Sequence, residues 1–372
     1  MKILYVTTIS LTMNTFFKPH IAMLVDEGNH VDIACNFAEL APDALYDELG
    51  CNAYQIDFSR SPLSMDNVKA YGQLKKLIEK GGYDIVHCHT PNASVITRLV
   101  CRKLRKKNGL KVFYTAHGFH FYKGAPKLNW LVFYPVEKFC SRFTDKLITI
   151  NGEDYALAKE NFSAGEIHHV PSVGINLSKY KNIVFDKKKK RQEISVPEDA
   201  FLLLSVGELN ENKNHQVIIR ALAKLNDPAI HYMVAGRGDK REELLALANQ
   251  LGVAERVHLL GFRRDITELN CTADVFCFPS LREGLPVSLM EAMACGTPIV
   301  CSKIRGNVDL IDQNSGILAD PTNVDEFAAA IQKLKNDSEL GEKFSKANSE
   351  KVQYFAEENI LKELKGVYYT KS

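Results

Sequence analysis

Residues 274–300 have the sequence DVFCFPSLREGLPVSLMEAMACGTPIV, which predicts a strand, a helix and a second strand in that order. Val275–Phe278 is an apolar run with the length of a buried strand. The stretch from Val287 to Ala294 predicts a short helix, and Pro286 suits its first position, where no backbone N–H is needed. Apolar strands that alternate with helices are typical of a parallel sheet covered on both faces. The segment therefore predicts an α/β fold.

Two glutamates near the start of this predicted helix carry the first functional signal. Glu283 should lie in the turn after the strand, and Glu291 about a turn and a half into the helix. The free N–H groups at a helix start bind phosphate, whereas carboxylates repel it and suit neutral hydroxyl groups. A sugar nucleotide offers both kinds of group. The alternative is that the glutamates only interact with the helix dipole.

The same alternation of apolar runs and helical patterns extends over the whole chain. A length of 372 residues suggests about two domains. The runs form two sets of about six, which predicts two Rossmann-like domains with parallel sheets. We interpret the segment from Asn176 to Glu198, which contains Lys187–Arg191, as a linker or solvated edge; a nuclear-targeting signal is the less favoured alternative. The expected strands are Ile3–Thr7, Val31–Cys35, Ile85–Cys88, Val112–Thr115, Leu147–Ile150, Ile167–Val170, Phe201–Val206, His231–Ala235, Val257–Leu260, Val275–Phe278, Ile299–Cys301 and Gly316–Leu318.

The composition is that of a soluble globular protein, with 45% hydrophobic and 25% charged residues and a net charge of +2. Nine cysteines occur without a CxxC pair or zinc spacing, which indicates structural thiols in a reduced cytoplasmic compartment. The apolar run at the N-terminus is too short for a signal peptide, and no apolar stretch approaches the roughly 20 residues of a membrane-spanning helix. We therefore expect a cytoplasmic protein.

Ligands of parallel α/β sheets bind outside the carboxyl ends of the strands, which selects further candidates in the second half. Gly207 follows a strand, and Lys213 precedes a helix, where a positive charge is unfavourable unless an anion binds. The alternative is a solvated surface lysine. Gly236 and Arg237 belong to a Gly-x-Gly turn that suits close approach of a nucleotide; its likeness to an integrin-binding tripeptide is the less favoured interpretation. Arg263 follows the next strand.

In the first half, His117 directly follows a strand and precedes a glycine, which permits close approach of a ligand. The alternative is a purely structural histidine. His89 ends another strand, and Ser10 and Thr12 follow the first one. No carboxylate lies at metal-site spacing from His89. If the two sets of strand ends face each other, the site lies in a cleft between the domains.

With these motifs, the chain resembles the retaining glycosyltransferases of family 4, which have the GT-B fold. The most specific match is Glu283–Val300, with support from Asp84–Thr90, Tyr114–His120 and Asp145–Ile150. The resemblance covers nearly the whole length and is closest to enzymes of bacterial capsule, exopolysaccharide and lipid-linked glycan assembly. It implies two Rossmann-like domains that face each other across a cleft: residues 1–177 for the acceptor and 178–350 for the nucleotide sugar. A C-terminal helix in 351–372 would pack back on the first domain.

The resemblance also implies roles for individual residues. Glu291 would bind the ribose hydroxyls, Glu283 the transferred sugar, and Lys213 the leaving diphosphate. His117 would contact the donor sugar. Many relatives carry an arginine where this chain has Glu208, so Arg282 or another basic group would have to replace that phosphate contact. Many also carry a Gly-Gly loop where this chain has Ser10–Asn14, which leaves open whether phosphate or acceptor binds there. Further donor-side candidates are Gly284, Leu285 and Pro286 around the phosphates, with Gly207, Gly236, Arg237 and Arg263; the acceptor-side candidates are Ser10, Thr12 and His89.

The implied reaction moves a sugar from a nucleoside diphosphate, expected to be UDP with an N-acetylhexosamine, to a polyprenyl-diphosphate-linked or other glycan. The leaving diphosphate needs fixed positive charge. Lys213 and the helix start supply that charge without a metal, and we expect no cofactor. One alternative is a sugar-nucleotide epimerase on the same fold, and another is a non-catalytic binding subunit of a polysaccharide assembly complex. A dehydrogenase is disfavoured because no GxGxxG follows the first strand.

A basic stretch in the first half predicts contact with an anionic membrane surface at the inner face of the cell membrane. From Ile85 to Val136 there is no Asp or Glu, and Trp130 lies in an aromatic cluster. Basic residues near such a surface contribute about 1 kcal/mol each. The alternatives are a solvated helix face with a buried Trp130, and nucleic acid, for which no recognition motif occurs. The basic residues are Arg98, Arg102, Lys103, Arg105, Lys106, Lys107, Lys111, Lys123 and Lys127.

Overall fold

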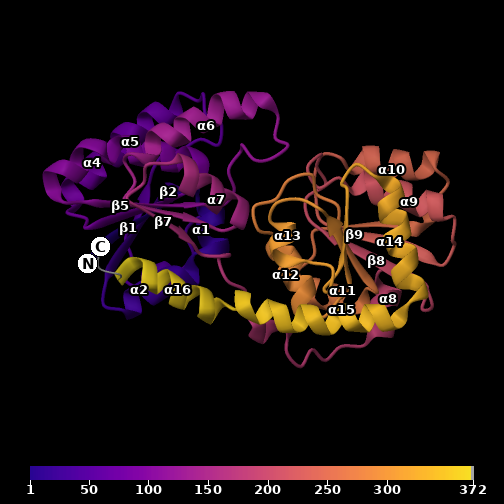
Figure 1. The fold of residues 1–372 in the computed structure, drawn as a ribbon. Helices are drawn as coiled ribbons and strands as arrows, with labels where there is room; N and C mark the ends of the chain where they lie inside the picture. The colour runs from indigo at the N-terminus through magenta and orange to yellow at the C-terminus, as the bar shows by residue number, and fades with distance from the viewer. Residues whose placement is uncertain (370–372) are drawn as a thin grey trace. The chain divides into compact units, whose positions relative to one another are not determined.

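The computed structural model describes residues 1–369, which form two compact units (Figure 1). The first unit consists of Met1–Gly174 and the segment that begins at Glu357, and the second of Ile175–Ala356. The sequence places the corresponding boundaries after residues 177 and 350. Each unit has its own parallel sheet with helices on both faces, so the expected α/β class is confirmed.

The first sheet has seven strands in the order β3-β2-β1-β4-β5-β6-β7. The order reverses between β1 and β4, so the carboxyl ends of these two strands mark the switch point where ligands bind in such sheets. Each expected strand of this half is present, whereas β3 is too short to give a sequence signal. The strands are β1 (Lys2–Ile9), β2 (His30–Asn36), β3 (Ala53–Gln55), β4 (Ile85–His89), β5 (Lys111–Ala116), β6 (Lys146–Thr149) and β7 (Glu166–His169).

The helices of the first unit cover both faces of this sheet. Alternate residues of β1 point into two cores: Leu4 and Val6 into the one under α4 and α5, Ile3 and Tyr5 into the one under α2 and α16. Figure 1 shows α4, α5 and α6 on one side of the sheet and α2 with α16 on the other. The helices are α1 (Ser10–Phe16), α2 (Lys18–Asp26), α3 (Leu45–Glu48), α4 (Asp66–Gly81), α5 (Pro91–Asn108), α6 (Lys127–Ser141), α7 (Gly152–Asn161) and α16 (Glu357–Tyr369).

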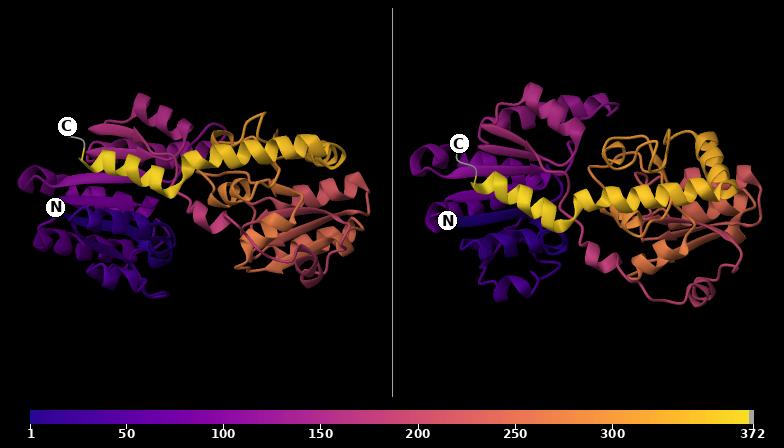
Figure 2. Two further views of the ribbon diagram at one scale, coloured as in Figure 1. Left: turned by 90° about the horizontal axis from the view of Figure 1, so that it is seen from below. Right: turned by 60° about the horizontal axis from the view of Figure 1, so that its bottom comes forward.

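The C-terminal helix α16 packs on the first unit, as Figure 2 shows from two further directions. Ile360 and Leu364 are buried in the core beside α2. The Tyr368 hydroxyl lies 2.5 Å from His87 Nδ1, and Lys146 Nζ donates to the Val367 carbonyl at 2.8 Å. Helix α16 therefore completes one face of the first sheet.

The second sheet has six strands in the order β10-β9-β8-β11-β12-β13, with its switch point between β8 and β11. All six strands expected for this half are present. They are β8 (Phe201–Val206), β9 (Ile230–Ala235), β10 (Val257–Gly261), β11 (Val275–Phe278), β12 (Ile299–Ser302) and β13 (Ile317–Ala319). The helices are α8 (Lys187–Glu193), α9 (His215–Leu225), α10 (Arg241–Gln250), α11 (Ile266–Thr272), α12 (Val287–Ala294), α13 (Asn307–Leu310), α14 (Val324–Asn336) and α15 (Ser338–Lys351), with 3₁₀ turns at Leu177–Tyr180, Ala254–Arg256 and Val352–Phe355.

The basic run of the expected linker forms α8, and part of it is buried. The Asp186 side chain accepts hydrogen bonds from the backbone of Lys188 and Lys189 and so caps the helix. Arg191 is 5% exposed and donates to the carbonyls of Glu198 and Ala200 at 3.0 and 2.6 Å. The prediction of a solvated edge is wrong for this residue, because the run folds into a helix that turns Arg191 inward, where it finds carbonyl acceptors.

Candidate active site

The switch point of the second sheet brings Lys213 and Glu283 together. Lys213 precedes α9 and Glu283 precedes α12, and Lys213 Nζ lies 2.7 Å from Glu283 Oε1. Their side chains are only 19% and 13% exposed. The ammonium group also lies 4.7 Å from the centroid of the Phe278 ring. A Cβ added to Gly207 would lie 3.1 Å from Lys213 Cε, so this glycine gives the lysine stem room. The site thus holds an ion pair at the sheet edge, with the Lys213 ammonium group as its cation.

The turn that carries Glu283 is braced from two sides. The Leu281 N–H donates to the Asn212 carbonyl at 2.8 Å, and Asn212 Nδ2 donates to the Arg282 carbonyl at 3.0 Å. On the other side, Arg305 Nε donates to the Glu283 carbonyl at 3.1 Å. Arg305 is 6% exposed. Sequence reasoning missed it; its position just after a buried strand was the available signal.

Next to Glu283, helix α12 begins at Val287. Pro286 is the residue before the helix, one position earlier than expected, and among the described residues no side chain caps this end. A Cβ at Gly306 would lie 2.4 Å from the Gly284 carbonyl oxygen. The glycine therefore allows the loop after β12 to contact the loop before α12. Leu285 and Pro286 are both buried. The helix start can bind an anion through its first N–H groups.

Glu291 lies in α12 and contacts a residue that the sequence did not indicate. The Tyr180 hydroxyl donates to Glu291 Oε1 at 3.0 Å. Burial raises the pKa of the Glu291 carboxyl, while the Tyr180 hydrogen bond and the Lys179 charge oppose that rise. The sequence did not indicate Tyr180 as a site residue, because it lies in the segment interpreted as a linker. Tyr180 therefore holds one carboxylate oxygen, and no hydrogen bond within residues 1–369 engages the other.

The glycines after β9 serve the protein's own packing. A Cβ at Gly236 would lie 1.8 Å from the Gly207 carbonyl oxygen, and one at Gly238 would lie 2.2 Å from that of Leu209. The loop after β8 therefore lies directly on the loop after β9, which explains the Gly-x-Gly turn without a ligand. The Arg237 guanidinium lies 5.6 Å from the ring centroid of Phe262, which is 61% exposed. This pair joins Arg237, a donor-side candidate from the sequence, to an exposed aromatic ring.

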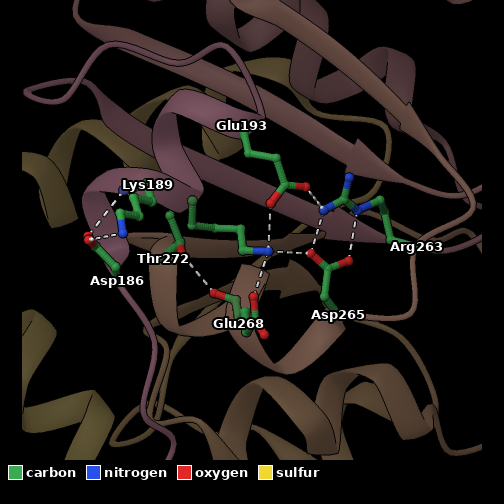
Figure 3. Close-up of polar contacts among 8 residues, drawn as sticks. Asp186, Lys189, Glu193, Arg263, Asp265, Glu268 and Thr272 are labelled. Carbon is green, nitrogen blue, oxygen red and sulfur yellow. Dashed lines mark hydrogen bonds and ion pairs between the residues drawn. The ribbon is translucent and has the colours of Figure 1, made fainter.

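Arg263 belongs to an ion-pair network that joins α8 to the start of α11 (Figure 3). Its guanidinium contacts the carboxylates of Asp265 and Glu193. Lys190 Nζ contacts the same two residues at 2.8 and 2.9 Å and Glu268 at 2.5 Å. Hydrogen bonding to Arg263 is the main cause that lowers the pKa of Asp265. Since two carboxylates already balance its charge, Arg263 is a weaker candidate for binding an anion.

In the first unit, His117 follows β5 and packs against the buried rings of Phe17 and His89. His117 Nε2 lies 3.1 Å from Nδ1 of His89. The ring of His89 lies 4.3 Å from that of Phe17 and 4.6 Å from that of Tyr5, centroid to centroid. His89 is 1% exposed, whereas His117 is partly exposed. Burial lowers the pKa of His117 to about 4, so its ring is neutral at neutral pH.

The two remaining acceptor-side candidates lie in α1 rather than in a loop. Ser10 is the first helical residue, is buried, and donates its hydroxyl to the Leu40 carbonyl at 2.5 Å. Thr12 lies in the first turn and is partly exposed. Ser10 therefore has a structural contact of its own. Within residues 1–369, no group of three His, Cys, Asp or Glu side chains could hold a metal ion.

An open apolar pocket of about 190 Å³ adjoins the His117 loop in the first unit. Gly118 and His120 line it next to His117, and Glu137 lies at its wall with a buried partner, Arg98, at 2.8 Å. On its far side α6 contributes Val132 and Val136, which are 47% and 41% exposed. The pocket therefore connects the loop of His117 with an exposed apolar helix face.

Known protein families match both units. A model described as glycosyl transferases group 1 matches residues 186–351, and one described as glycosyl transferase 4-like matches residues 2–151. The putative glycosyltransferase EpsD of Bacillus subtilis (strain 168) is 37% identical over 372 residues, 99% of this chain and 96% of that protein. The chain belongs to the group 1 glycosyltransferases. The family resemblance inferred from the sequence motifs is thereby confirmed.

Two further comparisons concern a relative with a stated substrate and the fold. The UDP-Gal:alpha-D-GlcNAc-diphosphoundecaprenol alpha-1,3-galactosyltransferase of Escherichia coli is 28% identical over 283 residues, 74% of this chain and 72% of that protein. The crystal structure of Anabaena HepE with UDP and glucose matches with a TM-score of 0.81 and 20% identity, and covers 100% of both chains. This likeness confirms the GT-B fold.

Proposed function

We propose that this group 1 glycosyltransferase transfers a sugar, with retention of configuration, from a UDP-sugar to a polyprenyl-diphosphate-linked glycan. Its place would be the cytoplasmic face of the cell membrane, in the assembly of a bacterial surface polysaccharide. The observation that carries the proposal is the Lys213–Glu283 pair beside the uncapped start of α12. It combines a fixed cation, free N–H donors and a carboxylate at the switch point of one sheet.

The second unit supplies the donor site in this proposal. The diphosphate binds at the N–H groups around Gly284, Leu285 and the start of α12, with Lys213 beside it. Glu283 accepts hydrogen bonds from hydroxyls of the sugar, and the free oxygen of Glu291 accepts from the ribose. Phe262 and Arg237 offer an exposed surface on which a base can stack. HepE, which shares the fold, was crystallised with UDP.

The chemistry follows from the charge of the leaving group. Negative charge grows on the UDP oxygen as the sugar departs, and a cation preorganised in a partly buried site stabilises it. Lys213 is that cation, so we propose transfer without a divalent metal. His117 contacts the donor sugar. Arg305 donates to the Glu283 carbonyl and so keeps the turn before α12 in place.

The first unit supplies the acceptor site. We propose that the apolar pocket beside the His117 loop takes the part of the isoprenoid chain that follows the diphosphate. The outer face of α6 would then lie in the membrane, with the basic face of α5 near lipid phosphates. Two basic residues do not belong to this surface: Arg98 is buried against Glu137, and Arg105 contacts Asp145 at 2.5 Å.

None of the helices in the described chain combines the length and apolarity that a bilayer-spanning segment needs. The exposed apolar residues of α6 are Leu128, Trp130, Leu131, Val132, Val136 and Phe139.

The transferred sugar in this proposal is an N-acetylhexosamine. The family resemblance favours an N-acetylhexosamine, whereas the name of the E. coli relative specifies UDP-galactose. A panel of UDP- and GDP-sugars, each with and without a sugar-diphosphate-polyprenol, tests both. We expect a glycosylated lipid only with a UDP-N-acetylhexosamine. A new sugar nucleotide formed without acceptor would show an epimerase, and binding without any product would show a non-catalytic subunit.

A further inference from the structure

The contact between His89 and His117 determines which nitrogen of His117 carries its proton. A neutral imidazole has one N–H and one acceptor nitrogen. Burial holds the pKa of His89 well below its usual value and that of His117 at about 4, so both rings are neutral. One of the two facing nitrogens, His89 Nδ1 or His117 Nε2, must therefore donate to the other at 3.1 Å.

The buried surroundings of His89 decide between the two arrangements. If His117 donated, the proton of His89 would sit on Nε2. That atom is buried, and no polar atom among residues 1–369 lies within hydrogen-bonding reach of it. Buried N–H groups without an acceptor are rarer in proteins than acceptors without a donor. His89 therefore carries its proton on Nδ1 and donates to His117 Nε2, which leaves only a lone pair unpaired.

We infer that His89 is a positioning residue that fixes His117 as a hydrogen-bond donor through Nδ1. With Nε2 accepting from His89, the proton of His117 sits on Nδ1, and the partly exposed ring can offer this N–H to a ligand. A donor at this position suits a sugar hydroxyl or an acetamido carbonyl oxygen. It excludes His117 as a general base, since neither nitrogen has a free lone pair.

The packing around His89 keeps this arrangement rigid. Its ring stacks on that of Tyr5, with an interplanar angle of 26°, and lies 4.2 Å from the ring of His87. His87 in turn bonds Thr115 Oγ1 at 2.8 Å and the Tyr368 hydroxyl of α16. Tilting the His89 ring out of its plane would break the stack on Tyr5. The inference rests on the proposed function only where it gives His117 a sugar to contact.

The direct test is the tautomer of His117 in the intact protein. Two-bond ¹H–¹⁵N correlation spectra of protein labelled at histidine nitrogens distinguish Nδ1–H from Nε2–H, and a His117→Gln variant identifies the signal. We expect Nδ1–H on His117 and an unprotonated Nε2. A proton on Nε2 of His117 would overturn the inference whatever reaction the enzyme catalyses.

Variants of His89 test whether the tautomer matters for transfer. The amide nitrogen of His89→Asn stands at the position of Nδ1 and can still donate, whereas His89→Gln places it one bond farther and His89→Leu has none. We expect kcat/KM for the donor to fall about threefold to tenfold in the Leu and Gln variants, the effect of one hydrogen bond, and to recover in the Asn variant. Equal losses in all three with the His117 tautomer unchanged would overturn the role, and full activity of His117→Gln would instead refute the proposed site.

Discussion

At the scale of single residues, Glu291 combines a functional role with a cost to folding. Its pKa is raised by burial, so the folded state keeps this proton to higher pH than the unfolded chain does, and stability falls as pH rises through that window. Glu291→Gln is never ionised and can still accept from Tyr180. We expect a melting temperature at neutral pH at or above that of the wild type, with donor KM raised about tenfold or more by the loss of a charge-assisted hydrogen bond. An unchanged KM would remove Glu291 from the donor site.

Lys213 should act on turnover more than on ground-state binding, because charge on the leaving group grows toward the transition state. Lys213→Gln should lower kcat by about 10²–10³-fold, the size of effect seen when one such stabilising group is removed. Lys213→Arg keeps the charge and serves as the matched control. The rates are measured with and without a chelator. Strict dependence on added Mg²⁺ or Mn²⁺ would show that the positive charge comes from elsewhere.

At the scale of helices and strands, the apolar runs predicted most elements because the inner strands of each sheet, such as β4 and β9, are buried on both faces. The bounds of β8, β11 and α12 match the expected residues. The sequence could not predict β3, which has only three residues, or the inward face of α8, whose basic residues depend on acceptors such as Asp265 that are distant in sequence. The pairing of Lys213 with Glu283 was equally out of reach, because the order of the strands brings them together.

The exposed basic residues of α5 should contribute to membrane binding. Replacing Arg102, Lys103 and Lys106 by serine should weaken co-sedimentation with anionic liposomes at low salt, since these exposed charges are attracted to lipid phosphates. The matched control changes three exposed lysines of α8 in the second unit to serine and should leave liposome binding unchanged. Equal loss in both variants would indicate a non-specific effect of net charge. The control residues are Lys187, Lys188 and Lys189.

At the scale of the whole molecule, buried histidines should make both units sensitive to acid. The pKa values of His20 and His117 in the first unit, and of His215 and His258 in the second, are lowered to about 4, chiefly by burial. Between that value and about 6.5 the unfolded chain binds more protons, so stability is lost as pH falls through this window. Urea unfolding at pH 7, 5.5 and 4.5 measures this loss as a decrease in the free energy of unfolding. A free energy of unfolding that stays constant or rises on acidification would contradict the assignment of these rings as neutral.

The most direct test of the account is calorimetric titration of UDP into the full protein and two variants. The proposed nucleotide site lies in the second unit alone, while His117 belongs to the first. Glu291→Gln should therefore weaken UDP binding about tenfold or more. His117→Gln should leave UDP affinity unchanged and lower the rate of sugar transfer. Unchanged UDP affinity in Glu291→Gln, or a loss confined to His117→Gln, would contradict the central claim that the second unit binds the nucleotide.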